Sequence, residues 1–341
     1  MRYRTLGNSG TIVSELALGT MTFGAESDEN QSTAMLNHYL DAGGNFIDTA
    51  DVYAGGRSEE IIGQWMKSNP ARADAVILTT KARFPTGDGP NDVGVSRRHL
   101  ARALDASLQR LGLDHIDLYQ LHAWEQLTPI EESLRFLDDA VRAGKISHYG
   151  FSNYTAWQLT KATDLAARNG YTPPVTLQPQ YNLLTRGIEL EIVDAALDAG
   201  LGLLPWSPLA GGWLTGKYRR GAEPTAGNRY AKPQDRAVRD QRDNDERVWE
   251  VIATLTSIAD AHSSPPGQVA LAWLLAKPAV TSVILGARTI DQLVDNLAAT
   301  DVHLSEAELA DLDRVSAPRF DEYPYSAWAR QDRHRRLGGG R

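Results

Sequence analysis

The stretch FIDTADVYAGGRSEE, residues 46–60, changes character after its third residue. It begins as an apolar run and then turns to acid, hydroxyl and glycine, with Asp48, Asp51 and Tyr53 inside six positions. An apolar run without alternation is typical of a strand buried on both faces. Two carboxylates and a phenol where such a strand ends indicate a functional site only if other strands end in the same way.

Similar apolar runs recur along the chain and alternate with segments of helical spacing, such as the one that carries Leu100, Leu104, Leu108 and Leu111 on one face. Short buried strands that alternate with helices indicate a parallel sheet. Eight such units in roughly 300 residues fit an α/β fold of the (β/α)8 TIM-barrel type better than a doubly wound sheet. The predicted strands are Leu16–Thr20, Asn45–Thr49, Val76–Lys81, Ile116–His122, Ser147–Ser152, Thr176–Tyr181, Gly202–Trp206 and Thr281–Gly286.

Turn and capping residues between these runs predict a hairpin, a helix boundary and a long loop. The segment YRTLGNSGTIVSEL, with a turn at Asn8–Gly10, predicts an N-terminal β-hairpin cap. Thr128 and Glu131 have capping-box spacing around Pro129, and Gly144 suits the end of that helix. Residues 207–245 form the longest irregular piece, which predicts a functional or mobile loop. We expect one domain over residues 1–332 and a disordered Arg/Gly tail at 333–341.

The composition excludes several classes of function. The 341 residues contain no cysteine, which removes disulfides, thiolate metal sites and thiol nucleophiles. A net charge of −8 with interspersed acids and bases offers no basic face for nucleic acid. No apolar run approaches the roughly 20 residues of a membrane span, and the first residues lack the apolar region of a signal peptide. We therefore expect a soluble, cytoplasmic protein without nucleic-acid or membrane partners and without a metal.

Three successive predicted strands each deliver one ionisable group at the end that forms the active site of a barrel. These are Asp48, Lys81 and His122, and Tyr53 follows Asp48 closely enough to reach the same rim. A phenol with a pKa near ~10 is a poor acid at neutral pH unless a cation stabilises its phenolate, which Lys81 would do while Asp48 holds it in place. The set can hand a proton to a carbonyl oxygen, with His122 orienting that carbonyl.

Each of these residues also has an ordinary structural interpretation. Strand-end aspartates commonly close turns, a strand-end lysine is commonly solvated, and a lone histidine or tyrosine usually packs in the core. Asp51 is assigned to turn geometry, and Trp65, Trp157 and Trp273 are assigned to packing. The charge run 236–247 is interpreted as a solvated surface, with a belt over a bound cofactor as the alternative. Only the occurrence of the four ionisable groups at neighbouring strand ends favours chemistry.

The remaining strand ends suit a nicotinamide nucleotide, which would provide the reductant. Ser152, Asn153 and Gln178 offer hydroxyl and amide groups for a carboxamide, and Trp206 offers a flat face for stacking. The last strand runs into GARTIDQLVDN, where a helix start and Arg288 suit phosphates, including the 2′-phosphate of NADPH. No GxGxxG follows a strand, which excludes a Rossmann site.

These motifs resemble the aldo-keto reductase superfamily over essentially the whole chain. The matching segments are LALGTMTFG, FIDTADVYAGGRSE, LTTK, DLYQLHAW, GKISHYGFSN, LQPQYN, WSPLAGGWLTGKY and GARTIDQLVDN. A tryptophan at position 206 resembles the bacterial branch and the potassium-channel β subunits. The resemblance implies a catalytic tetrad of Asp48, Tyr53, Lys81 and His122, with Tyr53 as the proton donor.

The resemblance also implies how the cofactor binds. The residues it assigns to the cofactor are Gly19, Thr20, Ser152, Asn153, Gln178, Trp206, Ser207, Leu209, Gly211, Lys217, Gly286, Arg288, Gln292 and Asn296. Gln292 has an equal claim as a helix cap, because Thr289 and Gln292 have capping-box spacing. Trp124 and Trp213 are assigned to the wall of the substrate cavity. NADPH is expected in preference to NADH, because Arg288 is the main anchor for the 2′-phosphate.

The resulting expectation is an NADPH-dependent oxidoreductase that reduces an aldehyde, a ketone or a sugar-like carbonyl to the alcohol. Two alternatives remain open in the sequence. One is an NADP(H)-sensing regulatory protein with slow turnover. The other is an alcohol or sugar dehydrogenase that works in the oxidative direction, since the same residues serve both directions. The sequence leaves the substrate undecided, and it permits a homo-oligomer.

Overall fold

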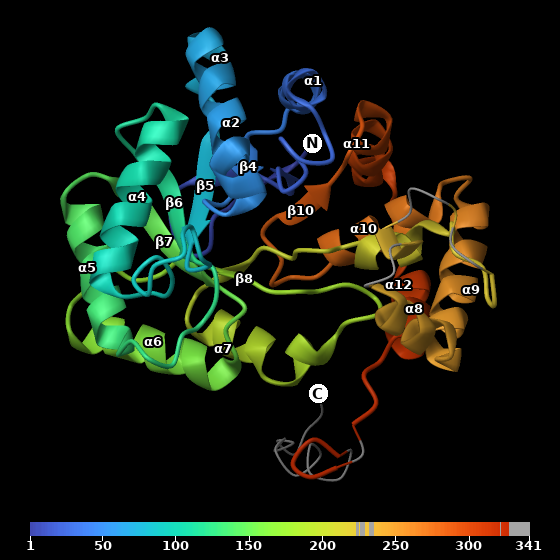
Figure 1. Ribbon diagram of the computed structural model, residues 1–341. Coiled ribbons are helices and arrows are strands. Elements are labelled where there is room, and N and C mark those ends of the chain that lie inside the picture. The colour runs from blue at the N-terminus through green and yellow to red at the C-terminus, as the bar shows by residue number, and fades with distance from the viewer. Residues whose placement is uncertain (223–224, 226–228, 232–234, 321, 327–341) are drawn as a thin grey trace.

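The computed structural model describes residues 1–222, 225, 229–231, 235–320 and 322–326. Its centre is a sheet of parallel strands surrounded by helices (Figure 1). The strands are Leu16–Gly19 (β3), Phe46–Asp48 (β4), Ile77–Ala82 (β5), Ile116–Leu121 (β6), Ile146–Ser152 (β7), Thr176–Gln178 (β8), Gly202–Leu203 (β9) and Val283–Gly286 (β10). The sheet order is β10, β3, β4, β5, β6, β7, β8 and β9, so all eight predicted strands are present.

The two edges of this sheet meet. A parallel bridge joins Leu203 of β9 to Val280, just before β10, and the Ile284 N–H donates to the Pro205 carbonyl at 3.0 Å. These contacts confirm the predicted (β/α)8 barrel. The strands β8 and β9 are shorter than predicted, because Pro179 and Pro205 have no N–H to continue the ladder.

The predicted N-terminal hairpin is confirmed as an antiparallel pair, Tyr3–Thr5 (β1) and Ile12–Ser14 (β2). It packs where the barrel strands begin. Gly7, in the turn, has a φ of +55°, and a Cβ added there would lie 2.0 Å from the Val175 carbonyl oxygen. Only glycine combines that backbone conformation with so close an approach, which seats the hairpin against the barrel.

Helices cover the outside of the barrel (Figure 1). They are Glu29–Asp41 (α1), Arg57–Ser68 (α2), Pro70–Ala73 (α3), Arg97–Leu111 (α4), Ile130–Arg142 (α5), Ala156–Arg168 (α6), Ile192–Asp198 (α7), Arg236–Asp243 (α8), Glu246–Ala261 (α9), Pro266–Leu275 (α10), Ile290–Leu297 (α11) and Glu306–Val315 (α12). The predicted apolar face of α4 is confirmed, since Leu100, Leu104 and Leu111 are buried and Leu108 packs against the core while partly exposed. Among the described residues, no helix is long and apolar enough to cross a membrane.

Two local predictions are wrong. Helix α5 has Pro129 as its N-cap, so Thr128 lies one residue too early to cap it and its hydroxyl donates to Glu125 Oε2 at 2.7 Å. The prediction that Trp157 packs in the core is wrong, since it is 60% exposed, whereas Trp65 and Trp273 are buried as predicted. The predicted helix end at Gly144 is confirmed by its φ of +73°.

The described parts of the piece after β9 contain more regular structure than its composition predicts. It contains the short helices Ala210–Thr215 (η3) and Arg229–Ala231 (η4) as well as α8. Part of the charge run packs inward, because the Arg242 Nη1 donates to the Ala210 carbonyl at 2.8 Å and lies over the Tyr230 ring. The predicted tail, residues 333–341, and the last residues of the predicted domain, 327–332, lie outside the described residues.

Candidate active site

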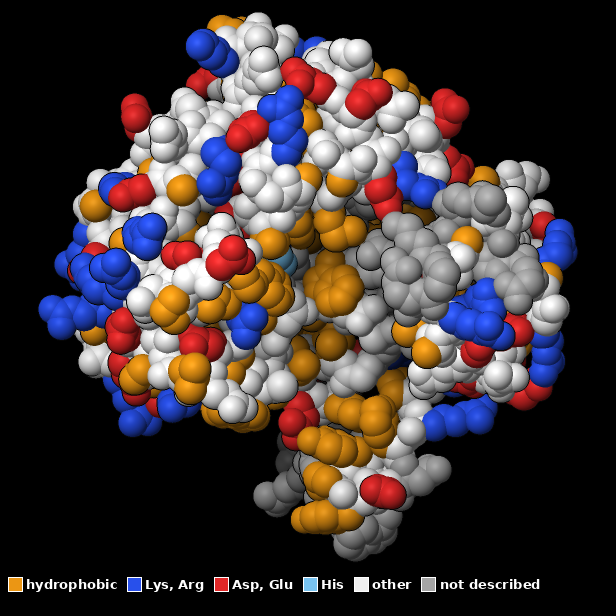
Figure 2. All heavy atoms as spheres, viewed as in Figure 1, with side chains coloured by type: hydrophobic (Ala, Val, Ile, Leu, Met, Phe, Trp, Pro, Cys, Tyr) orange, Lys and Arg blue, Asp and Glu red, His pale blue; other side chains and the backbone are white. Residues whose placement is uncertain are grey.

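A cavity of about 780 Å³ lies at the carboxyl ends of the barrel strands. Figure 2 shows its opening near the centre of one face, with hydrophobic side chains gathered around it. Most of the predicted site residues line this cavity: Gly19, Thr20, Asp48, Tyr53, His122, Ser152, Asn153, Gln178, Trp206, Ser207, Leu209, Gly211, Lys217, Gly286, Arg288, Gln292 and Asn296. Lys81 lies beneath the surface of the cavity, where it is fully buried.

Strand register explains why Asp48 and Lys81 meet. Asp48 is the register partner of Thr79 on the neighbouring strand β5. Side chains two residues apart on a strand share a face, so Lys81 points to the same side as Thr79 and Asp48. The Lys81 Nζ donates to Asp48 Oδ2 at 2.8 Å, to the Thr49 carbonyl at 2.7 Å and to the Tyr53 hydroxyl at 3.3 Å. One buried ammonium therefore joins the carboxylate to the phenol.

The protonation states of this cluster follow from burial and from the paired charges. Burial lowers the pKa of Lys81, but Asp48 and Tyr53 outweigh it and the net direction is upward. Burial raises the pKa of Tyr53 more than the Lys81 charge lowers it. The net upward direction differs from the sequence expectation that Lys81 would make the phenol more acidic. The site thus holds a charged lysine beside a phenol that keeps its proton at neutral pH.

His122 follows β6 and completes the group of four. Burial, with the charges of Lys81 and Arg83, lowers the pKa of His122 to about 3, so its ring is neutral at physiological pH. The ring stands edge-on to Tyr53, with centroids 6.0 Å apart, and packs against Phe84 at 4.7 Å. A neutral imidazole in this place can hydrogen-bond a carbonyl group without adding a positive charge.

The predicted amide-binding residues form one hydrogen-bonded chain. The Trp206 Nε1 donates to Asn153 Oδ1 at 3.0 Å, and the Asn153 Nδ2 donates to the His122 carbonyl at 3.0 Å. The Ser152 hydroxyl donates to the Gln178 carbonyl at 2.9 Å, and the Gln178 Nε2 donates to Asp48 Oδ1 at 2.8 Å. The bond between Gln178 and Asp48, which the sequence did not predict, connects the amide-binding residues to the buried acid and fixes the distance between Gln178 and Asp48.

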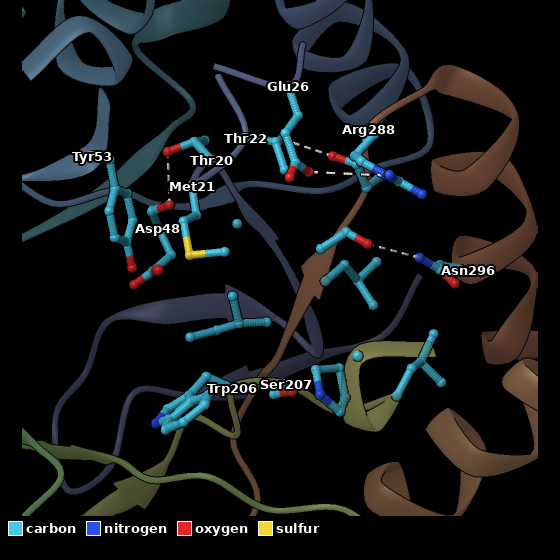
Figure 3. Close-up of a pocket in the computed structure, with 18 of the residues that line it drawn as sticks. Thr20, Met21, Thr22, Glu26, Asp48, Tyr53, Trp206, Ser207, Arg288 and Asn296 are labelled. Atoms are coloured by element: carbon cyan, nitrogen blue, oxygen red, sulfur yellow. Dashed lines mark hydrogen bonds and ion pairs between the residues drawn. The ribbon is translucent and has the colours of Figure 1, made fainter. Parts of the chain in front are cut away.

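The opposite end of the cavity holds two cations, Lys217 and Arg288, and the acid Glu26, whose Oε2 lies 4.0 Å from the Arg288 Nε. Burial and the nearby charge of Arg288 lower the pKa of Lys217. Gly211 and Gly212 have φ angles of +67° and +92°, and a Cβ at Gly212 would lie 2.4 Å from the Lys217 Nζ. Figure 3 shows the two ends, with Tyr53 and Asp48 at one and Arg288 with Asn296 at the other, and Trp206 and Ser207 on one wall between them.

Other predicted cofactor residues have structural duties as well. A Cβ at Gly19 would lie 2.8 Å from the Leu285 carbonyl oxygen, so this glycine permits close packing of β3 on β10. Gln292 serves the start of α11, since its N–H donates to Thr289 Oγ1 at 3.3 Å. Its side chain accepts from the Arg288 N–H at 3.0 Å instead of closing a reciprocal capping box with Thr289. The Asn296 Nδ2 lies 3.5 Å from the Gly286 carbonyl oxygen.

Two of the predicted residues lie elsewhere. Trp213 is 2% exposed and stacks on Tyr218, with centroids 4.7 Å apart, so its assignment to the substrate wall is wrong. The short helix η3 turns its ring away from the cavity and into an aromatic cluster. Trp124 lines a neighbouring hollow instead of the main cavity. Sequence reasoning missed several residues that line the main cavity, namely Met21, Thr22, Glu26, Val52, Phe84, Pro208, Gly212, Thr215, Ile284, Leu285, Ala287 and Asp295. Most of these residues lie within a few positions of a predicted strand end, and that closeness is the feature of the sequence that could have identified them.

Behind the four residues lies a buried acid that sequence reasoning assigned to a turn. Asp51 is 2% exposed, and neither carboxylate oxygen has a hydrogen-bond partner among the described residues. Burial and the charge of Glu59 raise its pKa to about 7, and the charge of Arg110 only partly opposes them. Arg110 is already engaged, because its Nε donates to Glu59 Oε2 at 2.7 Å. Asp51 therefore carries a proton through much of the acidic pH range.

This raised pKa predicts a pH-dependent stability effect. Between about pH 4 and pH 7 the unfolded state ionises Asp51 while the folded state does not, so the free energy of unfolding should fall as pH rises through that window. Asp51→Asn keeps the shape of the protonated acid and never ionises. We expect the variant to be more stable than the wild type by about 2 to 4 kcal/mol at pH 8, with a smaller gain at pH 5. Urea unfolding at both pH values measures the difference.

Asp114→Asn, a change at an exposed aspartate, is the matched control and should show no comparable pH-dependent gain. If Asp51→Asn were instead less stable at pH 8, the ionised carboxylate would be a favourable partner of Arg110. That result would overturn the assignment of Asp51 as a buried acid that holds its proton.

Comparison with known proteins supports the resemblance seen in the sequence. The sequence model described as the Aldo/keto reductase family matches residues 15–317. The chain is 38% identical over 337 residues to an uncharacterized oxidoreductase, YrpG, of Bacillus subtilis, covering 96% of this chain and 100% of that protein. It is 40% identical over 304 residues to a probable voltage-gated potassium channel subunit beta of Oryza sativa, covering 89% and 92%.

A third relative carries a reductase name. The versiconal hemiacetal acetate reductase of Aspergillus parasiticus is 33% identical over 347 residues, covering 94% of this chain and 98% of that protein. These matches extend over nearly the whole length of each partner. With the barrel and its cavity, they confirm the suspected family and support an oxidoreductase of small carbonyl compounds. The chain belongs to the aldo/keto reductase family.

Proposed function

We propose that the protein reduces an aldehyde or ketone to the alcohol with NADPH, using Tyr53 as the general acid. The observation that carries the proposal is the buried Lys81, which bonds both Asp48 and the Tyr53 hydroxyl at one end of a long cavity. Burying a charge costs free energy, so the stability of the fold alone does not explain a buried cation between an acid and a phenol. Its position beside the cavity favours chemistry.

The residues of the cavity fit a nicotinamide dinucleotide phosphate. The volume of the cavity, about 780 Å³, is within the range of small-molecule and cofactor sites. Ser152, Asn153 and Gln178 would hold the carboxamide, with Trp206 against the ring. Lys217 and the glycine-rich turn of η3 would hold the pyrophosphate, with Arg288 at the 2′-phosphate. Two cations close enough for Arg288 to lower the Lys217 pKa suit a polyanionic ligand.

When bound, the nicotinamide supplies the hydride for the carbonyl carbon. The Tyr53 hydroxyl donates its proton to the carbonyl oxygen as negative charge develops there. Lys81 stabilises the phenolate left behind, and Asp48 keeps Lys81 charged and in place. The neutral His122 ring hydrogen-bonds the same oxygen and orients it. Each role uses a contact or a protonation state that the geometry supports.

Two alternatives are distinguished by kinetics. An NADP(H)-sensing regulator would oxidise its bound nucleotide about once and release the product slowly, so steady-state turnover on a panel of aldehydes and ketones separates it from an enzyme. A dehydrogenase working oxidatively would show the larger kcat/KM for alcohols or sugars with NADP⁺. Nothing in the cavity favours either alternative over carbonyl reduction.

The cofactor assignment is tested by replacing Arg288. A charge-assisted hydrogen bond contributes about 1.5 to 3 kcal/mol, so Arg288→Ala should weaken NADPH binding about 10- to 100-fold while NADH binding changes little. Quenching of tryptophan fluorescence during titration with each nucleotide measures both affinities, with Trp206 as a reporter in the site. A preference for NADPH that disappears in the variant supports the proposed anchor.

Two further variants make this test specific. Lys217→Met should weaken NADPH and NADH alike, because the pyrophosphate is common to both. Arg57→Ala removes an exposed guanidinium that pairs with Glu29 and Glu60 outside the cavity, and it should change neither affinity. Equal binding of NADPH by the wild type and Arg288→Ala would refute the role of Arg288. Absence of binding by either nucleotide would refute the cofactor site.

A further inference from the structure

A second hollow, of about 560 Å³, adjoins the proposed catalytic end of the main cavity. Asn153 lines both spaces, so they meet beside His122, whose carbonyl accepts from Asn153. The other walls of this hollow come from Arg83, from the loop after β6 that carries Trp124, and from the start of α6. A substrate whose carbonyl lies at Tyr53 can therefore extend into this space.

Arg83 is the cation among the residues that line this hollow. It lies two residues after Lys81, and its Cζ stands 5.0 Å over the Phe84 ring, which in turn packs on His122. The Arg83 side chain is partly buried, and among the described residues its buried Nε has no hydrogen-bond partner and no acid forms an ion pair with it. Its charge contributes to the lowered pKa of His122, which places its field in the catalytic end.

The surroundings leave this guanidinium open to a ligand. Glu125, which also lines the hollow, directs Oε2 to the Val95 N–H at 2.8 Å and to the Thr128 hydroxyl at 2.7 Å. Those bonds tie its carboxylate to its own loops. Trp124 supplies an aromatic wall and is held edge-on by Tyr154 and Trp157, each with centroids 5.3 Å away. A partly buried guanidinium beside a flat apolar wall suits an anion carried on a carbon skeleton.

We infer that Arg83 binds an anionic group, a carboxylate or a phosphate, at the far end of the carbonyl substrate. The inference rests on the proposed carbonyl reduction and narrows its substrates to acidic carbonyl compounds. The planar guanidinium matches either anion with two parallel hydrogen bonds, and the stacked Phe84 ring holds it in orientation. Arg83 therefore acts on specificity, while proton transfer belongs to Tyr53.

Matched substrate pairs test this role in Arg83→Gln. The pairs are 4-carboxybenzaldehyde with benzaldehyde, and glyceraldehyde 3-phosphate with glyceraldehyde. We expect KM for the charged member to rise about 10- to 100-fold, the range of a charge-assisted hydrogen-bond pair, while the neutral member changes little. The pair that responds identifies whether carboxylate or phosphate is the preferred anion. Arg83→Lys should give an intermediate KM, because it restores the charge without the two-pronged geometry.

Arg97→Gln is the control for loss of a surface charge, since Arg97 is exposed and pairs with Asp139 on α5, outside both cavities. It should leave all four KM values unchanged. A purely structural effect of Arg83→Gln through Phe84 and His122 would change charged and neutral substrates alike. Equal changes within both pairs, or no change in either, would overturn the inference.

A binding measurement separates this inference from the proposed function. 4-Carboxybenzyl alcohol and benzyl alcohol are titrated into the protein, with the fluorescence of Trp124 as reporter. If no aldehyde is reduced, yet the carboxylate binds to the wild type and about 10-fold or more weakly to Arg83→Gln, the anion site stands and the catalytic proposal fails. If the two alcohols bind the wild type equally, or Arg83→Gln binds the carboxylate as well as the wild type does, the anion site is refuted.

Discussion

Tyr53→Phe is expected to lower kcat about 10²- to 10⁴-fold, the contribution of a positioned general acid, while the dissociation constant for NADPH stays within about twofold. Only the hydroxyl is removed, and its one described partner is the Lys81 Nζ at 3.3 Å. The aromatic ring keeps its edge contact with His122. Loss of NADPH absorbance with an aromatic aldehyde measures turnover, and fluorescence titration measures binding.

The chain offers a close control for this substitution. Tyr119 is a fully buried tyrosine on β6 whose hydroxyl has no hydrogen-bond partner in the described part of the chain. Tyr119→Phe removes the same atom from the barrel without touching the cavity, so it should keep full turnover and equal or greater stability. Comparable turnover in Tyr53→Phe and in the wild type would show that the phenol is not the proton donor.

Lys81→Met is expected to lower both activity and stability. It leaves Asp48, which is 2% exposed, without its cation, and breaking one partner of a buried ion pair costs about 3 to 5 kcal/mol. Turnover should fall about 10²- to 10⁴-fold, because the phenolate of Tyr53 loses its stabilising charge. The midpoint of urea unfolding and the rate of NADPH oxidation measure the two effects separately.

A double variant separates the structural effect from the chemical one. In Lys81→Met with Asp48→Asn, the uncompensated carboxylate is gone, and the amide can still hydrogen-bond Gln178, whose Nε2 donates to Asp48 Oδ1 in the wild type. We expect most of the lost stability to return while turnover stays low. A Lys81→Met protein as stable as the wild type would contradict the buried pair, and recovery of turnover in the double variant would contradict the role of Lys81.

Much of the fold and of the cavity was predictable because it depends on local pattern. Apolar runs of strand length located the eight strands of the barrel, and their ends located Asp48, Lys81 and His122. The errors arose where a neighbour in space decides the outcome. Helix α5 has Pro129 as its N-cap, so Thr128 lies outside it, and Trp213 stacks on Tyr218 instead of lining the substrate cavity. Asp51 was assigned to a turn because its sequence neighbours give no sign of Glu59 or Arg110 beside it.

The sequence by itself determined the barrel, the family and the set of residues at the strand ends, because these follow from periodicity and from motifs read along one chain. Only the tertiary structure decided the electrostatics. Burial outweighs Lys81 in raising the pKa of Tyr53, keeps His122 neutral and holds a proton on Asp51. The tertiary structure also placed Arg83 in a hollow beside the cavity. Desolvation and Coulomb interactions depend on distances across space between segments far apart in the chain, and residue order does not contain those distances.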